Sequence, residues 1–273
     1  MHDTIYVLDF GSQYSHLITR RIREFGVYAE LVPVDFPFAK LKQAKGIVLS
    51  GGPQSLRNRT ALKTSKAIFE LGIPVLGICY GLQLVAHELG GQIRKAKKRE
   101  YGAAQITVIK PGKLFKGQPR TQQTWMSHQD QVVKLPHGFT ATARSANCRY
   151  VAIADEKRNI FGLQFHPEVM HTTYGRDMIK NFIALTRAKK TWTMRGFVNK
   201  TIKGIKAQVG DDKVVCALSG GVDSSVAATL VHKAIGKQLH CIFVDTGLLR
   251  KNEVKQVVRT FRSYQKMNLH VID

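Results

Sequence analysis

One cysteine of the sequence lies where a reactive thiol is expected. Cys79 is the centre of Gly77-Ile-Cys-Tyr-Gly81, between an apolar run and a predicted helix. Glycines on both sides of a strand-to-helix junction are typical of a nucleophile elbow, the tight turn that holds a nucleophile above a sheet. The helix dipole favours the thiolate there. The local pattern is equally compatible with a buried structural cysteine, the role we expect for Cys148, Cys216 and Cys241.

A cysteine nucleophile also needs a general base and a group that orients the base. His166 and Glu168 offer both in Gln164-Phe-His-Pro-Glu168, which follows a predicted strand. His166 would take the thiol proton and later protonate a leaving amine, while Glu168 would fix the imidazole tautomer. Ser50-Gly-Gly-Pro53 ends another strand, and its N–H groups with that of Tyr80 are suited to an oxyanion hole. A His-Pro turn beside a surface carboxylate is the alternative interpretation.

A second candidate site is the loop Ser219-Gly-Gly-Val-Asp-Ser-Ser225, between a predicted strand and a predicted helix. Glycines leave backbone N–H groups free to hold phosphate, and the helix N-terminus favours negative charge. The Gly-Lys-Ser/Thr sequence of Walker loops is absent, which argues against a kinase or GTPase loop. Asp223 is suited to hold Mg²⁺ on a phosphate. The alternative is a glycine-rich helix cap with no ligand.

The elements that position these groups have the pattern of a parallel α/β fold, in which short apolar runs alternate with amphipathic stretches. We predict strands over 4–9, 46–50 and 73–78, β-rich runs over 105–109, 139–144 and 160–165, and helices over 14–25, 60–71, 81–89 and 175–187. The pattern restarts with helices over 197–209, 222–235 and 253–264 and strands over 213–218 and 239–245. We therefore predict two tandem parallel-sheet α/β units, over 1–187 and 197–273, joined by a linker over 188–196.

Composition narrows the class of protein. The chain has 273 residues, of which 44% are apolar, so it has enough apolar residues for a core. No apolar run approaches the ~20 residues of a membrane helix, the N-terminus has no signal-peptide pattern, and four cysteines without a CxxC pair are too sparse for a disulfide framework. We therefore expect a cytoplasmic protein with reduced thiols and no membrane partner.

The chain is strongly basic, with 42 Lys and Arg against 19 Asp and Glu and a formal net charge of +23. These residues are spread along the sequence, and the one dense run, Arg94–Arg99, is short. No nucleic-acid-binding motif accompanies the charge. We expect a solvated basic surface with some affinity for phosphate groups, and no specific nucleic-acid partner.

Taken together, Ser50-Gly-Gly-Pro53, Gly77–Gln83 and Phe165-His-Pro-Glu168 resemble the class I, triad-type glutamine amidotransferases. The resemblance implies a Cys79–His166–Glu168 triad that hydrolyses glutamine to glutamate and ammonia through a glutamyl thioester. It also implies oxyanion-hole donors at Gly52 and Tyr80, and a glutamine-binding role for Gln83. The later loop resembles that of N-type ATP pyrophosphatases, which implies ATP binding, with Mg²⁺ at Asp223, by Ser219, Gly220, Gly221, Val222, Asp223, Ser224, Ser225 and Val244.

The combination resembles one enzyme family that joins both activities, the glutamine-hydrolysing GMP synthetases. Further similar motifs are Asp9–Tyr14, Arg99-Glu-Tyr-Gly102, Met126-Ser-His-Gln-Asp130, Gly210–Lys213 and Phe243–Arg250. The resemblance implies conversion of XMP, ATP and glutamine to GMP, AMP, pyrophosphate and glutamate. Gln129 departs from the glycine that this family usually has in Ser-His-Gly-Asp.

The end of the chain sets the last expectation. The sequence indicates only two strands in the second unit, too few to bury both faces of a parallel sheet, so the strand over 239–245 is expected near an open edge. We therefore expect a partial synthetase that retains at most the glutaminase half, with a homodimer expected only for a full-length chain. The alternatives are a stand-alone glutaminase that acts with a separate synthetase chain, another amidotransferase pairing, and a catalytically silent module that binds nucleotides or nucleic acid.

Overall fold

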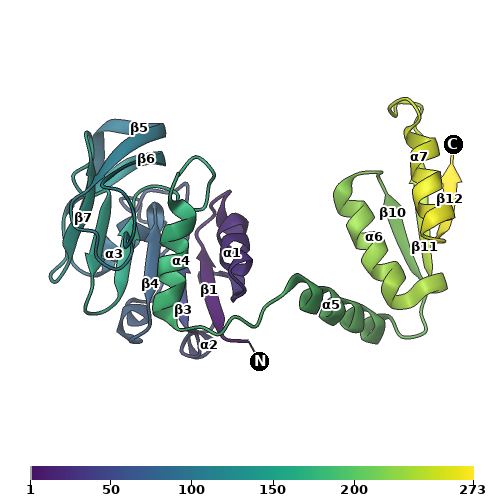
Figure 1. The fold of residues 1–273 in the computed structure, drawn as a ribbon, viewed down its shortest axis with the longest axis horizontal. Coiled ribbons are helices and arrows are strands. Elements are labelled where there is room, and N and C mark those ends of the chain that lie inside the picture. Colours follow the sequence, from purple (N-terminus) through teal and green to yellow (C-terminus); the bar gives the residue numbers. More distant parts are fainter. Residues whose placement is uncertain (1) are drawn as a thin grey trace. The chain divides into compact units, whose positions relative to one another are not determined.

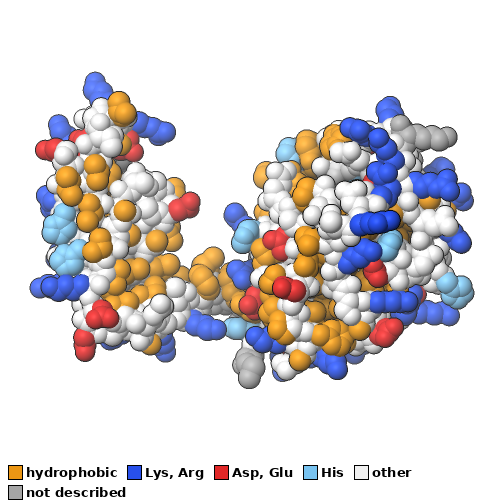
Figure 2. All heavy atoms as spheres, turned by 180° about the vertical axis from the view of Figure 1, so that it is seen from behind, with side chains coloured by type: hydrophobic (Ala, Val, Ile, Leu, Met, Phe, Trp, Pro, Cys, Tyr) orange, Lys and Arg blue, Asp and Glu red, His pale blue; other side chains and the backbone are white. Residues whose placement is uncertain are grey.

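The computed structural model describes residues 2–273, apart from the side chain of Lys97. The chain forms two compact units, the first ending at Trp192 and the second spanning Thr193–Asp273 (Figure 1). None of the helices in these described residues is long and apolar enough to cross a membrane. Lys and Arg side chains are spread over the visible surface of both units (Figure 2).

The first unit is built on one mixed sheet with the strand order β2-β1-β3-β4-β9-β8-β7-β5-β6. The strands β2, β1, β3, β4 and β9 are parallel to one another, and the remaining neighbouring pairs are antiparallel. The strands are β1 (Thr4–Asp9), β2 (Tyr28–Pro33), β3 (Gly46–Leu49), β4 (Val75–Ile78), β5 (Gln92–Val108), β6 (Thr121–Lys134), β7 (Thr140–Ser145), β8 (Ala152–Asp155) and β9 (Ile160–Leu163).

The burial pattern of the strands distinguishes the parallel half of the sheet from the antiparallel half. Strands β3 and β4 are buried at every position, as expected for parallel strands covered on both faces. Strand β6 instead alternates between buried and exposed positions over most of its length, the pattern of an antiparallel strand with one solvated face. The carboxyl ends of β3, β4 and β9 therefore lie side by side, which brings together the segments that follow them.

Helices cover both faces of the parallel half. Helices α1 (Ser15–Glu24) and α4 (Gly175–Thr186) contribute buried residues to one core cluster. Helix α3 (Tyr80–Glu88), helix α2 (Phe38–Leu41) and the 3₁₀ turn η1 (Lys66–Glu70) contribute to the other. The sheet thus separates two apolar layers.

The second unit contains helix α5 (Met194–Val209), β10 (Val214–Leu218), α6 (Val222–Ile235), the 3₁₀ turn η2 (Gly236–Gln238), β11 (Leu239–Val244), α7 (Glu253–Val258), the π-helical segment η3 (Arg259–Tyr264) and β12 (Asn268–Ile272). The three strands form a parallel sheet in the order β10-β11-β12. One face packs on the helices through Leu218, Cys241, Phe243 and Leu269. The other face exposes apolar side chains, including Val215, Val244 and Ile272.

The structure corrects several predictions. The second unit has three strands rather than two, because Asn268–Ile272 also pairs, and β11 is consequently the central strand rather than an edge. The predicted helix over 60–71 is only the turn Lys66–Glu70, capped by the Ser65 hydroxyl, because only Ile68 and Phe69 in the turn reach the core. Cys216 is half-buried rather than buried. Helix α5 begins at Met194, within the range predicted as a linker.

Candidate active site

Cys79 occupies the turn between β4 and α3 with an unusual backbone conformation. Its φ is +52° and its ψ is −102°, a combination that costs a non-glycine residue free energy and is concentrated at functional sites. The flanking glycines make the turn possible. A Cβ on Gly77 would lie 2.4 Å from the carbonyl oxygen of Gly81, and one on Gly81 would lie 2.3 Å from that of Leu49. The backbone thus has the geometry of the predicted nucleophile elbow.

His166 and Glu168 form a buried pair just beyond β9. Nδ1 of His166 lies 2.8 Å from Oε1 of Glu168, and the two residues are 4% and 1% exposed. Because the carboxylate accepts a hydrogen bond, it orients the ring with Nδ1 protonated and leaves Nε2 for another partner. The ring is held further by an edge contact with Tyr14 and by a hydrogen bond from the backbone N–H of His166 to the carbonyl of Trp125.

The environment of His166 favours its charged form. Burial alone would lower the pKa of His166, but the charge of Glu168 and the interactions of the ring with Cys79 and Glu168 outweigh this effect. The pKa of His166 is therefore raised well above its ordinary value of 6.5. An imidazolium beside a thiol stabilises the thiolate.

The predicted oxyanion-hole donors lie beside the thiol. Gly52, Cys79 and Tyr80 line the same cavity, of about 540 Å³. Tyr80 is the first residue of α3, so its N–H is one of the amides that a helix leaves without an internal acceptor. The loop that carries Gly52 is fixed by the Ser50 hydroxyl, which accepts a hydrogen bond from the Phe10 N–H. A Cβ on Gly52 would lie 2.6 Å from the Phe10 carbonyl oxygen, so glycine is required there.

The cavity also contains polar groups suited to an amino-acid substrate. Gln83 lines it, and its side-chain Nε2 donates to the Asp130 carbonyl at 2.9 Å. The buried Asp130 carboxylate accepts hydrogen bonds from Ser55 and, at 3.2 Å, from Nε of Arg57. A second cavity of about 260 Å³ adjoins Cys79 and is also lined by Tyr14 and His166. The thiol is therefore accessible from a space large enough for a small polar molecule.

The remaining thiols differ from Cys79. Burial raises the pKa of Cys148 to about 12 and that of Cys241 to about 11, so neither thiol ionises at neutral pH. Cys216 is half-buried on β10. None of these three cysteines lines the two cavities beside Cys79.

The second predicted site is the exposed loop that precedes α6. The hydroxyls of Ser224 and Ser225 donate to the carbonyl of Gly221, and the hydroxyls of Ser219 and Ser224 are 3.0 Å apart, so hydrogen bonds within the loop hold it curled. Gly220 has a φ of +75° within this curl. Val222 begins the helix, so the amides of its first turn lack internal acceptors and are free for an anion.

Other residues of this second site are placed as follows. Asp223 is exposed in the first turn of α6, and Val244, half exposed, ends β11. A cavity of about 430 Å³ beside the loop is lined by Gly220, Ser225, Arg250 and Lys251, among others. No cluster of three or more potential metal-ligating side chains occurs among residues 2–273. A cation at Asp223 would therefore need ligands from a bound phosphate.

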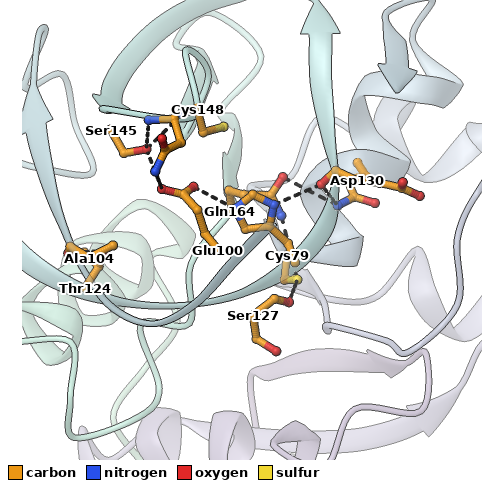
Figure 3. Close-up of polar contacts among 12 residues, drawn as sticks. Cys79, Glu100, Ala104, Thr124, Ser127, Asp130, Ser145, Cys148 and Gln164 are labelled. Carbon is orange, nitrogen blue, oxygen red and sulfur yellow. Dashed lines mark hydrogen bonds and ion pairs between the residues drawn. The ribbon is translucent and has the colours of Figure 1, made fainter. Parts of the chain in front are cut away.

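Three polar groups at the first site were given no role by sequence reasoning. The thiol of Cys79 donates to the carbonyl oxygen of Ser127 at 3.3 Å. The side-chain Nε2 of Gln164 lies 3.8 Å from Sγ (Figure 3), and Asp130 lines the larger cavity. Their motifs, Met126–Asp130 and Gln164–Glu168, were visible, but nothing in the sequence places the first beside Cys79.

Comparison with known proteins gives matches to two family models. The family model described as class-I glutamine amidotransferase matches residues 6–185, and that described as NAD synthase matches residues 172–272. A GMP synthase (glutamine-hydrolyzing) from Geobacillus kaustophilus is 53% identical over 99% of this chain and 54% of its own length. Another from Lactobacillus johnsonii is 53% identical over 98% of this chain and 52% of its own length.

The chain thus spans about half the length of the curated relatives it matches. Among solved structures, a protein from Thermoplasma acidophilum described as a GMP synthase subunit is 35% identical, with a TM-score of 0.61, and the match covers 68% of this chain and 94% of that one. The elbow, the buried His–Glu pair and the match over residues 6–185 all support one assignment. The chain belongs to the class-I glutamine amidotransferase family.

Proposed function

We propose that the first unit hydrolyses glutamine with Cys79 as the nucleophile, His166 as the acid and base, and Glu168 as the group that orients His166. The observation that carries the proposal is the buried 2.8 Å pair between His166 and Glu168, whose imidazole lines the same cavity as Cys79. Among the four cysteines, Cys79 alone combines the elbow with this cavity.

The reaction begins when Nε2 of His166 takes the thiol proton and the thiolate attacks the side-chain amide carbon of glutamine. The amide oxygen becomes an oxyanion that accepts hydrogen bonds from the N–H groups of Gly52 and Tyr80. The imidazolium returns its proton to the leaving nitrogen, so ammonia departs and a glutamyl thioester remains. His166 then deprotonates water, whose attack releases glutamate and restores the thiol of Cys79.

Substrate recognition uses the polar groups of the larger cavity. Gln83 and the Asp130 carboxylate line it, together with Arg57. A carboxylate and a guanidinium complement the α-ammonium and α-carboxylate of a free amino acid. Glutamine is thus held by both ends, its amide at Cys79 and its α-groups at the cavity wall.

For the second unit, the donor set of the loop fits a pyrophosphate group. The free amides at the start of α6, with Ser219, Ser224 and Ser225, hold the phosphates of ATP, and Val244 lies beside the base. Asp223 is exposed and would hold Mg²⁺ together with the phosphates. The cation would supply positive charge to neutralise the pyrophosphate that leaves when ATP activates a carbonyl oxygen.

The whole reaction follows from the two halves together. In a protein as long as the curated relatives, ATP adenylylates XMP, and ammonia from glutamine displaces AMP to give GMP. The GMP synthase names of relatives at 53% identity support this assignment.

The test is glutamate release from glutamine by the purified 273-residue chain, with and without XMP and ATP. Cys79→Ala is expected to abolish release, because no other thiol lines the cavity beside His166. Cys148→Ala is the matched control, because its thiol is buried with a pKa raised to about 12, and it should keep full activity. Equal release from the Cys79→Ala variant and the unmodified chain would refute the proposal.

A further inference from the structure

Two residues without a role in this chemistry, Glu100 and His128, form a buried hydrogen-bonded pair. Glu100, from Arg99–Gly102, places Oε2 3.0 Å from Nε2 of His128, from Met126–Asp130, and the two side chains are 7% and 1% exposed. Strands β5 and β6 shift register between Lys95 and Glu100. Glu100 follows this irregularity and is the direct cross-strand partner of His128. It lies on the buried face of β5 together with Ile106 and Val108.

Glu100 is ionised in this environment. Its Oε1 accepts hydrogen bonds from the Ser145 hydroxyl at 3.0 Å and from the Asn147 side chain at 3.3 Å (Figure 3). Burial alone would raise the pKa of Glu100, but the hydrogen bonds from His128, Ser145 and Asn147 lower it below its ordinary value. The carboxylate therefore only accepts hydrogen bonds, and its partners must donate.

His128 links this carboxylate to the backbone of its own strand. Its Nδ1 lies 3.2 Å from the carbonyl oxygen of Asp130, and its Nε2 lies 3.0 Å from Oε2 of Glu100. His128 thus ties the Asp130 backbone to a fixed anion on β5.

The backbone held in this way contacts the glutaminase site at two points. The carbonyl oxygen of Ser127 accepts the thiol hydrogen of Cys79 at 3.3 Å, and that of Asp130 accepts from Nε2 of Gln83 at 2.9 Å. Ser127–Asp130 also line the larger cavity with four consecutive residues. A shift of this segment would therefore move the acceptor at the thiol and one wall of the cavity together.

We propose that Glu100 and His128 form a positioning pair for glutamine hydrolysis, which holds Ser127–Asp130 against Cys79 and Gln83. The proposal rests on the proposed function. Neither side chain contacts the reacting atoms: the pair acts through the backbone carbonyls. The triad residues follow β4 and β9, whereas the pair stands on β5 and β6, so the pair governs the binding wall more than proton transfer.

The first test is steady-state kinetics of Glu100→Gln, His128→Gln and the double variant in the full chain. Each single variant should lower kcat/KM for glutamine by about tenfold or more, chiefly through a raised KM, because the cavity wall moves. The double variant should lose no more than either single variant, because both remove one interaction. If Glu100→Gln does not fold, His128→Gln tests the same interaction from the other side.

Asp155→Asn is the matched control, because Asp155 is also a buried carboxylate bound by a cation, Arg158, but lies outside both cavities beside Cys79. It should leave KM and kcat unchanged. An unchanged KM in folded Glu100→Gln, or losses that multiply in the double variant, would overturn the proposal.

A second test needs no turnover. Iodoacetamide should alkylate Cys79 at least about threefold faster in Glu100→Gln and His128→Gln than in the unmodified chain or Asp155→Asn, because the Ser127 carbonyl no longer holds the thiol proton. Equal alkylation rates would overturn the proposal. Failure of the unmodified chain to release glutamate would instead refute the proposed function, and the alkylation comparison would still decide on the pair.

Discussion

Replacing Glu168 by glutamine tests whether the buried carboxylate is needed as well as the imidazole. The change keeps the size of the side chain and removes a negative charge 2.8 Å from Nδ1 of His166. Glu168 is 1% exposed, so water cannot replace that charge. Burial then lowers the pKa of His166 without the charge of Glu168 to oppose it.

The size of the effect follows from the burial of the pair. Removing one partner of a buried ion pair costs about 3–5 kcal/mol. His166 becomes an imidazolium when it takes the thiol proton, so this cost falls on the transition state for attack. Taking the lower value, about 3 kcal/mol, kcat falls about 150-fold, since each 1.36 kcal/mol is tenfold in rate. The loss should be smaller than that of Cys79→Ala, which has no nucleophile.

The assay is glutamate release at saturating glutamine, with folding checked by circular dichroism. Glu156→Gln is a matched control, because Glu156 binds Lys113 away from both cavities beside Cys79, and it should keep the parent kcat. A folded Glu168→Gln protein with kcat within about fivefold of the parent would mean that the carboxylate does not stabilise the imidazolium. The triad argument would then be wrong.

Three further predictions concern the frame and the second site. Gly81→Ala would place a Cβ 2.3 Å from the Leu49 carbonyl oxygen, so the urea midpoint should fall by the equivalent of about 3 kcal/mol, and an unchanged midpoint would contradict the elbow geometry. Burial alone would raise the pKa of Asp155, but hydrogen bonds from Arg158 lower it, so its stabilisation is complete above its ordinary pKa of 3.8 and is lost as the pH falls through the lowered value. In Asp155→Asn, the unfolding free energy should therefore fall less steeply than in the parent as the pH drops below 3.8, as measured by urea denaturation at several pH values. The same slope in both proteins would contradict the stabilising role of Asp155. Asp223→Asn should weaken binding of a fluorescent ATP analogue about tenfold with Mg²⁺ and little without it, and an equal loss in both conditions would exclude a role through the cation.

Elements with strong local signals could be predicted from the sequence. Helix α6 has the predicted bounds Val222–Ile235, because glycines lie on both sides of a continuous run of helix-compatible residues. The strands β3 and β4 were found because each is a short, uninterrupted apolar run. Strand β12 was missed, because Asn268–Ile272 is short and has no turn signal that separates it from the preceding helix.

The candidate site likewise has residues that the sequence predicts and residues that it does not. Cys79, His166 and Glu168 lie in short motifs whose residue types indicate their chemistry. The pairing of Glu100 with His128 depends on the register of two long strands, and the residues are 28 positions apart. Side chains brought together by strand register leave no local pattern, so only the structure shows that they meet.

The neighbouring positions of β4 and β9 in the sheet have a consequence for how the protein acquires its activity during folding. Gln164 and Cys79 are 85 positions apart, and they meet only when Ile78 pairs with Leu163 in parallel. Joining such distant segments is slow, because the chain entropy of a long loop is lost first, whereas the consecutive strands β5 and β6 can form early. In a refolding experiment, protection of the β5 and β6 amides from hydrogen exchange should therefore precede the recovery of glutaminase activity.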